Sequence, residues 1–281
     1  MIPLFKEGVL LLCLSFFIYS GALLAHGTST SRLEQLQHAL SHHPNDANLY
    51  IARGRLHQER NEMRLALKDY QRAAKLKPQW PDVHYWLGLL YLEQEKYTLA
   101  LKRLNQYLAQ TDAAKGYVAL AKLHTQQEAF RLSVNAWNEA MVRDGNPSPA
   151  MFHQRAQVLM KMETAPYSHI LLAEIVMGLE AGIHQHGPIA SHVTLLVNVY
   201  ESNHLYAQAL KTLERLPRVL QVSPKWQFKK ASILALKGET FAAYQAFNHT
   251  LTTLNNLPSY KQVLPAYRAI KHAVRLSLMS L

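Results

Sequence analysis

The stretch that decides the fold runs from Ala47 to Trp80 and reads ANLYIARGRLHQERNEMRLALKDYQRAAKLKPQW. Two antiparallel helices approach closely only if each offers a small residue at the crossing, and an aromatic ring then fills the wedge beside them. Gly54, Ala66 and Tyr70 supply that set. Pro78 ends the second helix, because proline cannot donate the next backbone hydrogen bond. The stretch therefore predicts a pair of packed helices.

The small residues of this stretch return along the chain at a nearly constant interval. Gly54, Gly88, Ala121 and Ala156 follow one another at spacings of 34, 33 and 35 residues. A fixed period of this length is typical of stacked repeat units, each of which buries its apolar face against its neighbours. The pattern predicts six units, at residues 47–80, 81–113, 114–147, 149–187, 190–222 and 224–257.

The fourth unit is expected to be irregular. Phe152 and Ala156 fit a first helix, but the second helix, around residues 171–182, arrives several residues late, so residues 162–168 are the expected insertion. Single helices are expected at both ends of the array, over residues 31–44 and 259–278. The apolar stripe expected to cover the sixth unit consists of Val263, Tyr267, Ile270, Val274 and Leu278.

This pattern resembles the tetratricopeptide repeat (TPR) family, whose 34-residue unit has small and aromatic residues at set positions. The first unit supplies Tyr50, Gly54, Ala66, Tyr70, Ala73 and Pro78. It departs from the family at His57, where an aromatic ring is usual. The resemblance implies an all-α fold over residues 29–281, a right-handed superhelical solenoid of about six TPR-like helix pairs with N- and C-terminal capping helices.

The resemblance also implies where a ligand binds, since in this family the first helix of each pair lines the concave face. Carried over position by position, the expected groove residues are Arg55, Gln58, Tyr85, Leu89, Leu92, Lys115 and Lys122, with Glu59 and Glu93 at further groove positions. An apolar floor of Tyr85, Leu89 and Leu92 flanked by cations would suit an extended or helical peptide with acidic and apolar residues. Alternatively, the neighbouring helix buries Leu89 and Leu92.

The charge of the chain is uneven. The formal net charge is +11, and from Leu205 onward eleven Lys and Arg residues face only Glu214 and Glu239. Such asymmetry can indicate an acidic partner or anionic lipid. It is also compatible with an exported protein that is simply basic.

The first 25 residues have the three parts of a secretory signal. Lys6 precedes an apolar run over residues 9–19, and the small residues Ser20, Gly21 and Ala22 follow. We expect cleavage after Ala22 or Ala25. The alternative is an uncleaved anchor, because residues 8–25 are just long enough to span a membrane. Both interpretations predict a periplasmic or secreted body, which could stay attached to the membrane.

Catalytic and metal-binding patterns are not found in the sequence. It contains no Gly-x-Ser-x-Gly, His-Glu-x-x-His or glycine-rich phosphate motif. The closest histidine pairs, His42 with His43 and His184 with His186, have no nearby carboxylate or cysteine to complete a metal shell. We therefore expect no catalytic residues, cofactor, metal or nucleic-acid partner. The sequence favours a non-enzymatic interaction scaffold or assembly factor of the bacterial envelope, with a membrane-associated adaptor as the alternative.

Overall fold

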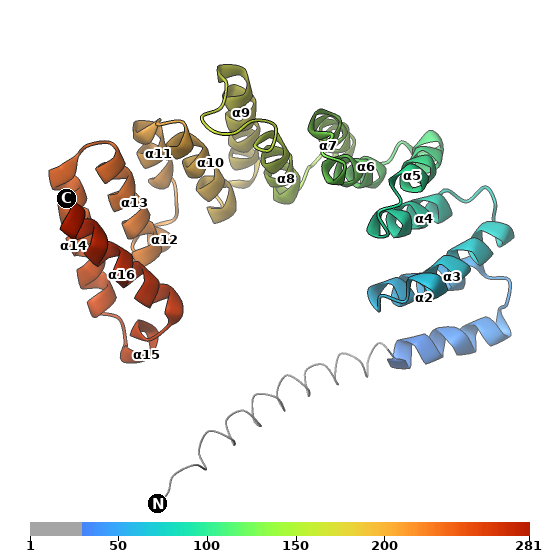
Figure 1. The fold of residues 1–281 in the computed structure, drawn as a ribbon. Coiled ribbons are helices and arrows are strands. Elements are labelled where there is room, and N and C mark those ends of the chain that lie inside the picture. Colours follow the sequence, from blue (N-terminus) through green and yellow to red (C-terminus); the bar gives the residue numbers. More distant parts are fainter. Residues whose placement is uncertain (1–29) are drawn as a thin grey trace, which may run out of the picture. The chain divides into compact units, whose positions relative to one another are not determined.

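The computed structural model describes residues 30–281, which form helices and turns without a strand (Figure 1). The expected all-α fold is thus confirmed for this part of the chain. The expected signal or anchor segment over residues 1–25 lies outside the described residues. The chain divides into two compact units, of which the first ends at Leu123 and the second begins at His124.

The first unit consists of consecutive antiparallel helices. A helix over residues 30–42 comes first. The helices that follow are α2 (Ala47–Glu59), α3 (Met63–Leu76), α4 (Pro81–Glu93), α5 (Tyr97–Thr111) and α6 (Ala114–Gln126), the last of which runs across the division between the units. Local signals set the starts of α2 and α4. The Asp46 carboxylate accepts a hydrogen bond from the Asn48 amide, and Pro81 occupies the first turn of α4, where its missing N–H costs nothing.

The second unit continues the pattern with helices of more variable length, from 4 residues in α12 and α15 to 18 in α9. They are α7 (Phe130–Asp144), α8 (Pro149–Leu159), α9 (His169–His186), α10 (Ala190–Ser202), α11 (Tyr206–Leu213), α12 (Arg218–Gln221), α13 (Pro224–Leu236), α14 (Thr240–Asn255), α15 (Ser259–Gln262) and α16 (Pro265–Ser280). Among the described residues, no helix is long and apolar enough to cross a membrane.

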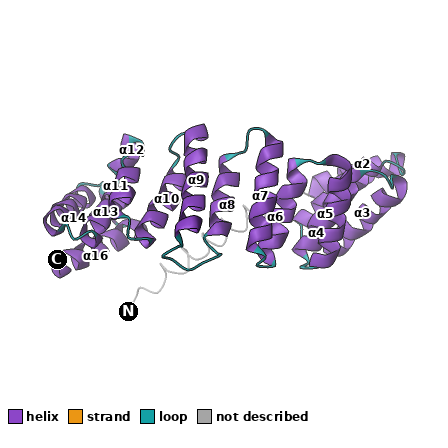
Figure 2. Ribbon diagram, turned by 90° about the horizontal axis from the view of Figure 1, so that it is seen from above, coloured by secondary structure: helices purple, strands orange, loops and turns teal. Residues whose placement is uncertain are grey.

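The turn inside most helix pairs has one repeated geometry. The residues at this turn have a left-handed backbone conformation, and they are Asn61, Glu95, Glu128, His204 and Gly238. The next amide donates to a carbonyl five residues earlier, as from Glu62 to His57 at 2.8 Å. The fourth pair departs from this pattern: a loop over residues 160–168 joins α8 to α9 (Figure 2).

The crossing of α2 and α3 has the close packing expected from the small residues. Ala66 and Tyr70 are fully buried. A Cβ atom added to Gly54 would lie 2.5 Å from Cε1 of Tyr70, so only glycine fits. In the second pair, a Cβ atom added to Gly88 would lie 2.7 Å from Cδ2 of Leu104. The 34-residue interval between these glycines thus reproduces the same close contact.

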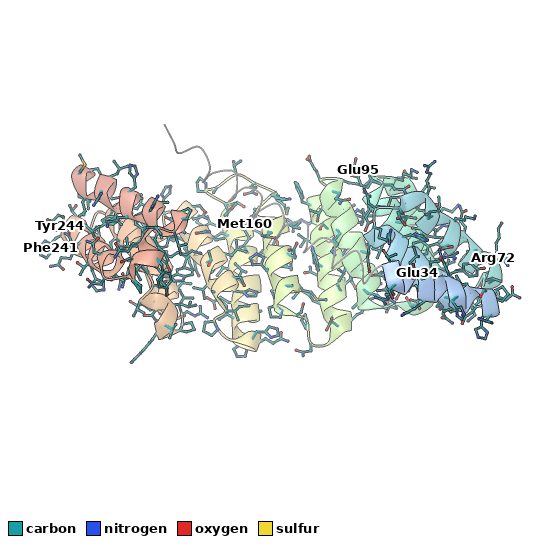
Figure 3. All side chains as sticks on the ribbon, turned by 90° about the horizontal axis from the view of Figure 1, so that it is seen from below. Glu34, Arg72, Glu95, Met160, Phe241 and Tyr244 are labelled. Carbon is teal, nitrogen blue, oxygen red and sulfur yellow. The ribbon has the colours of Figure 1, made fainter. Side chains whose placement is uncertain are left out.

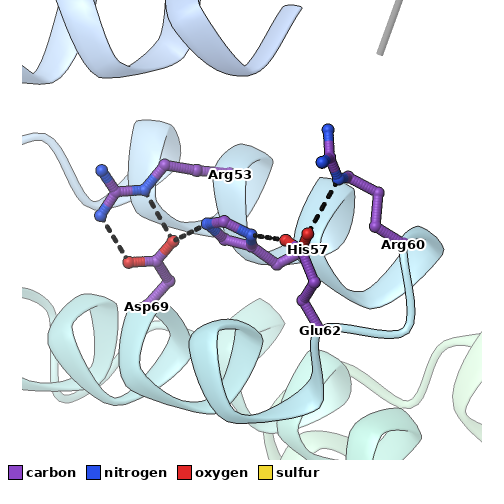
Figure 4. A network of polar contacts seen from close by, with 5 residues as sticks. All are labelled: Arg53, His57, Arg60, Glu62 and Asp69. Atoms are coloured by element: carbon purple, nitrogen blue, oxygen red, sulfur yellow. Dashed lines mark hydrogen bonds and ion pairs between the residues drawn. The ribbon is translucent and has the colours of Figure 1, made fainter. Parts of the chain in front are cut away.

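A polar network also joins α2 to α3 (Figure 4). Arg53 donates two hydrogen bonds to Asp69, at 2.8 and 2.7 Å. His57 Nδ1 lies 2.6 Å from a carboxylate oxygen of Glu62, which also accepts from Arg60 at 3.0 Å. His57 is buried at the place where a family member usually has an aromatic ring. The imidazole of His57 takes the place of that aromatic ring and adds polar contacts to Glu62 on one side and to Asp69 on the other.

The C-terminal cap differs from the expected single helix. Pro265 starts α16 after the short α15, so Val263 falls between the two helices and is 54% exposed instead of belonging to the covering stripe. Val274 is fully buried, and Ile270 and Leu278 pack against the same apolar cluster of α13 and α14. The expected stripe is therefore wrong at Val263. The proline moves the start of the covering helix beyond that residue.

Candidate functional site

A cavity of about 210 Å³ lies on the first helices of the first two pairs. Its lining consists of Arg55, Gln58, Glu59, Trp86, Leu89 and Glu93, from α2 and α4. These positions follow the helical repeat, since Arg55 and Glu59 are four residues apart and Trp86 and Leu89 are three apart, so each pair shares one helix face. The cavity combines an apolar wall with charges of both signs.

The side chains of Arg55 and Trp86 stack at this cavity. The guanidinium carbon of Arg55 lies 4.4 Å from the centre of the Trp86 ring, within the range of a cation–π contact. Arg55 remains exposed and makes no ion pair with any carboxylate among the described residues. A cation held flat on an aromatic ring keeps its outer N–H groups available for a ligand, so this pair can bind a carboxylate beside an apolar group.

A residue of the core orients the side chain of the neighbouring Gln58. Its Oε1 accepts a hydrogen bond of 2.8 Å from the hydroxyl of Tyr70. Burial raises the pKa of Tyr70 well above its ordinary value, so the phenol stays protonated and remains a donor. The buried tyrosine thereby orients a polar side chain at the cavity wall.

A row of aromatic rings continues from Trp86 along the first unit. The Tyr85 ring lies 5.2 Å from the Trp86 ring and 5.2 Å from the Tyr107 ring. Lys115 Nζ lies 4.8 Å from the Tyr85 ring and 5.2 Å from the Tyr107 ring. Lys115 also donates to Asp82 at 2.7 Å, so an internal carboxylate already balances its charge. This pairing makes Lys115 a support for the aromatic row.

The structure places the expected groove residues in different environments. Arg55, Gln58 and Leu89 line the cavity, and Tyr85 lies behind Trp86 in the aromatic row. The expectation that Leu92 forms part of the floor is wrong, because Leu92 is 6% exposed and packs with Ala100, Leu104 and other residues in the core. The alternative, burial by neighbouring helices, therefore holds fully for Leu92, whereas Leu89 is partly buried against the same cluster and also lines the cavity.

Two further differences concern residues at the edges of this set. Lys122 is exposed on α6 and is not part of the cavity lining. Trp86 was missed because the family rule names its neighbour Tyr85. The spacing of three residues between Trp86 and Leu89 is the signal that places both on one helix face.

The histidine pairs do not form a metal centre in the described part of the chain. His186 Nε2 lies 2.9 Å from the Pro147 carbonyl, whereas His184 is exposed. Among the described residues, no group of three or more histidine, cysteine, aspartate or glutamate side chains is arranged to hold a metal ion.

Comparison with known proteins agrees with this architecture. A family model described as TPR repeat matches residues 54–95, which include the whole cavity lining. No curated protein matches the sequence. Because the match covers residues 54–95 only, the sequence comparison identifies a TPR segment within the chain.

Solved structures show the same fold over a longer stretch. The chain is similar to YrrB, described as a TPR protein with an unusual peptide-binding site, with 19% identity and a TM-score of 0.50 over 76% of this chain and 98% of that chain. It is also similar to PilF of Pseudomonas aeruginosa, with 12% identity and a TM-score of 0.53 over 81% and 97% of the two chains. Yeast Tom70 has 15% identity and a TM-score of 0.53, over 77% of this chain and 44% of that chain. The structural similarity shows a TPR-type helical solenoid. At sequence identities this low, it shows nothing beyond the fold.

Proposed function

We propose that this TPR-fold chain is a non-enzymatic scaffold or assembly factor that binds a peptide or protein segment on the first helices of its first unit. Proteins of this fold are generally interaction scaffolds with peptide-binding grooves. The observation that carries the proposal is the stack of Arg55 on Trp86 at the edge of a cavity with polar and apolar walls. Aromatic and arginine side chains of this kind dominate the energetics of many protein interfaces.

The cavity lining suggests the chemistry of the bound segment. Trp86 and Leu89 offer a wall for one apolar side chain, and Arg55 offers donors for a carboxylate. Glu59 and Glu93 lie in the same lining and would attract a cation. Because Asp82 balances Lys115, the site supports a segment with charges of both signs better than a uniformly acidic one.

A selection experiment tests this proposal. Peptides selected from a random library on the intact protein should be enriched in sequences that place an apolar residue beside an acidic one. The double variant Trp86→Ala/Leu89→Ala should lose these peptides by at least about a hundredfold in affinity, because anchors of this kind contribute on the order of 2 kcal/mol each.

The matched control is Leu65→Ala/Leu99→Ala, which shortens two exposed leucines on second helices. This variant should bind the selected peptides as the wild type does, and circular dichroism should show equal helix content in all three proteins. Retained binding by the cavity variant, or equal losses in both variants, would refute the site.

We also propose that the protein works in the bacterial envelope. The support is the sequence pattern of residues 1–25, with Lys6, the apolar run and the small residues that follow it. After expression in a bacterium, N-terminal sequencing of the periplasmic fraction should find a chain that begins after Ala22 or Ala25. An intact Met1 in the cytoplasm would contradict export, whereas an intact Met1 in the membrane fraction would indicate the anchor.

A further inference from the structure

Two segments of the second unit share a short sequence and a common structure. Residues 216–226 read LPRVLQVSPKW and residues 257–267 read LPSYKQVLPAY, so five identical residues recur 41 positions apart. The first segment contains α12 and the second contains α15, each a single helical turn. In both, a glutamine side chain donates to two backbone carbonyls. Gln221 donates to those of Glu214 and Leu216, and Gln262 to those of Asn255 and Leu257, at distances between 2.6 and 3.0 Å.

The two segments lie at the same end of the second unit. Each one joins the second helix of a pair to the next first helix, since α12 lies between α11 and α13 and α15 lies between α14 and α16. Because paired helices run antiparallel, connections of this type all fall at one end of the stack. The glutamine hydrogen bonds tie both one-turn helices to the end of the preceding helix. We call the surface formed by residues 218–225 and 260–268 the double-turn edge.

The double-turn edge exposes apolar side chains that contribute little to the core. Val219 is 80% exposed, Val222 62% and Tyr260 68%. Val263 and Leu264 are also exposed. A hydrogen-bonded turn that exposes several large apolar side chains to water is typical of a surface that binds a membrane or another protein.

Cations are interleaved with these apolar side chains. Arg218, Lys225, Lys261 and Arg268 all belong to the double-turn edge, and none of them forms an ion pair with a carboxylate of the described residues. Three other basic residues of this region are paired with carboxylates: Arg215 with Glu180, Lys229 with Glu201 and Lys237 with Glu239. From Arg215 to Leu281 the chain has a single acidic residue, Glu239, and it pairs with Lys237. The edge therefore has a positive charge with no internal balance.

We propose that the double-turn edge binds the surface of an anionic lipid membrane. Valine, leucine and tyrosine side chains suit the boundary between headgroups and acyl chains, and lysine and arginine beside them are attracted to anionic headgroups. This function is separate from the peptide cavity of the first unit, and either can fail without the other.

The test uses the full chain and a position-specific probe. An environment-sensitive dye is attached at position 219 in Cys13→Ser/Val219→Cys, and at position 241 in Cys13→Ser/Phe241→Cys as the control. Phe241 is 75% exposed and points outward from α14 at its start, whereas α15 follows the other end of α14 (Figure 3). A probe of this kind reports contact at the edge even if residues 1–25 attach the chain to the vesicle.

The expected result is a blue shift of the dye at position 219, and not at 241, with vesicles of phosphatidylglycerol and phosphatidylcholine. Vesicles of phosphatidylcholine alone should produce no shift, and added salt should reverse it. Arg218→Gln/Lys261→Gln should weaken the membrane contact that the dye at position 219 reports by about twentyfold to thirtyfold, since each cation near an anionic surface contributes roughly fivefold. The charge-matched control Lys68→Gln/Lys102→Gln changes exposed residues of α3 and α5 and should alter binding by less than about twofold.

Three results would overturn the proposal. They are an equal shift at both dye positions, an equal shift with both kinds of vesicle, and equal losses in the two charge variants. Salt-sensitive binding to polyglutamate without binding to anionic vesicles would also overturn it, and would indicate an acidic protein as the partner of the edge.

Discussion

Asp69 of α3 accepts two hydrogen bonds from Arg53 of α2, at 2.8 Å from Nε and 2.7 Å from Nη2. The carboxylate side chain is only 4% exposed, whereas the arginine side chain is 22% exposed. The planar fork of arginine fits a carboxylate in one orientation, so the pair sets the register of the two helices. This contact lies beside the crossing of Gly54 and Tyr70 and belongs to the same helix pair.

Asp69→Ala is expected to lower the free energy of unfolding of the first unit by about 2 to 4 kcal/mol, because it leaves Arg53 half-buried without its partner. Urea denaturation at neutral pH measures the change. Asp82→Ala is the control, since its ion pair with Lys115 is exposed and should contribute less than about 1 kcal/mol. Similar losses in the two variants would show that burial of the Asp69 pair has no special importance.

Glu62 makes the first unit sensitive to acid. Hydrogen bonds from His57 and then Arg60 lower the pKa of Glu62 below its ordinary value of 4.5. A lowered pKa means that the stabilisation is fully present above pH 4.5 and is lost as the pH falls through the lower folded-state pKa. Glu62→Gln should therefore be less stable than the wild type at pH 7, and the difference should shrink on acidification. A difference that is constant with pH would contradict this origin.

Gly54→Ala should destabilise the first helix pair by about 1 to 3 kcal/mol, because the added methyl group overlaps the buried Tyr70 ring. Thermal unfolding measures the change. Gly178→Ala is the comparison: its added Cβ would meet only the end of the Arg155 side chain, which can move. A smaller shift of the melting temperature is expected for Gly178→Ala, and the reverse order would contradict the packing described for α2 and α3.

Leu92→Ala should act on stability and not through the binding surface. Removing a buried leucine side chain costs about 2 to 5 kcal/mol, whereas the same change at the exposed Leu99 should stay within about 0.5 kcal/mol. Denaturation and peptide binding, measured on both variants below the unfolding transition, separate the two effects. A folded Leu92→Ala protein with normal stability and lost binding would contradict this prediction and show that Leu92 belongs to the groove floor.

His192 should make the second unit sensitive to mild acid. Its side chain is fully buried, and burial, with smaller contributions from His153 and His186, lowers the pKa of His192. The unfolded chain therefore takes up a proton that the folded chain resists, so stability present above the ordinary pKa of 6.5 is lost as the pH falls below it. His192→Leu should reduce this loss between neutral pH and pH about 5. An unchanged pH profile of unfolding would contradict this role.

Much of the fold could be predicted because the residues that define the repeat are ones with strict steric requirements. Gly54 and Gly88 each lie against a large side chain that leaves no room for a Cβ atom, so their interval marks equivalent helix crossings. Prolines mark helix starts in the same local way, as at Pro81 and Pro265. The C-terminal cap departs from the expected single helix, because the helical spacing of apolar residues from Val263 onward does not reveal that Pro265 starts a new helix.

The candidate site could be predicted only in part. Helix periodicity indicates which residues share a face, but it does not tell how far the next helix covers that face. Leu89 and Leu92 are three residues apart on α4, yet Leu89 lines the cavity and Leu92 is enclosed by residues of α5 and α6. Whether the charge of Lys115 is balanced also depends on a tertiary contact, the hydrogen bond to Asp82, 33 residues away.

The sequence by itself determined the helix pairs, their period and the helix face that Arg55 and Leu89 occupy. These follow from local sterics and from the helical repeat of 3.6 residues. The tertiary structure alone decided that Arg55 stacks on Trp86, that Asp82 balances Lys115 and that Leu92 is buried. The physical reason is that exposure and charge balance depend on side chains from neighbouring helices, whose approach distances the sequence does not specify.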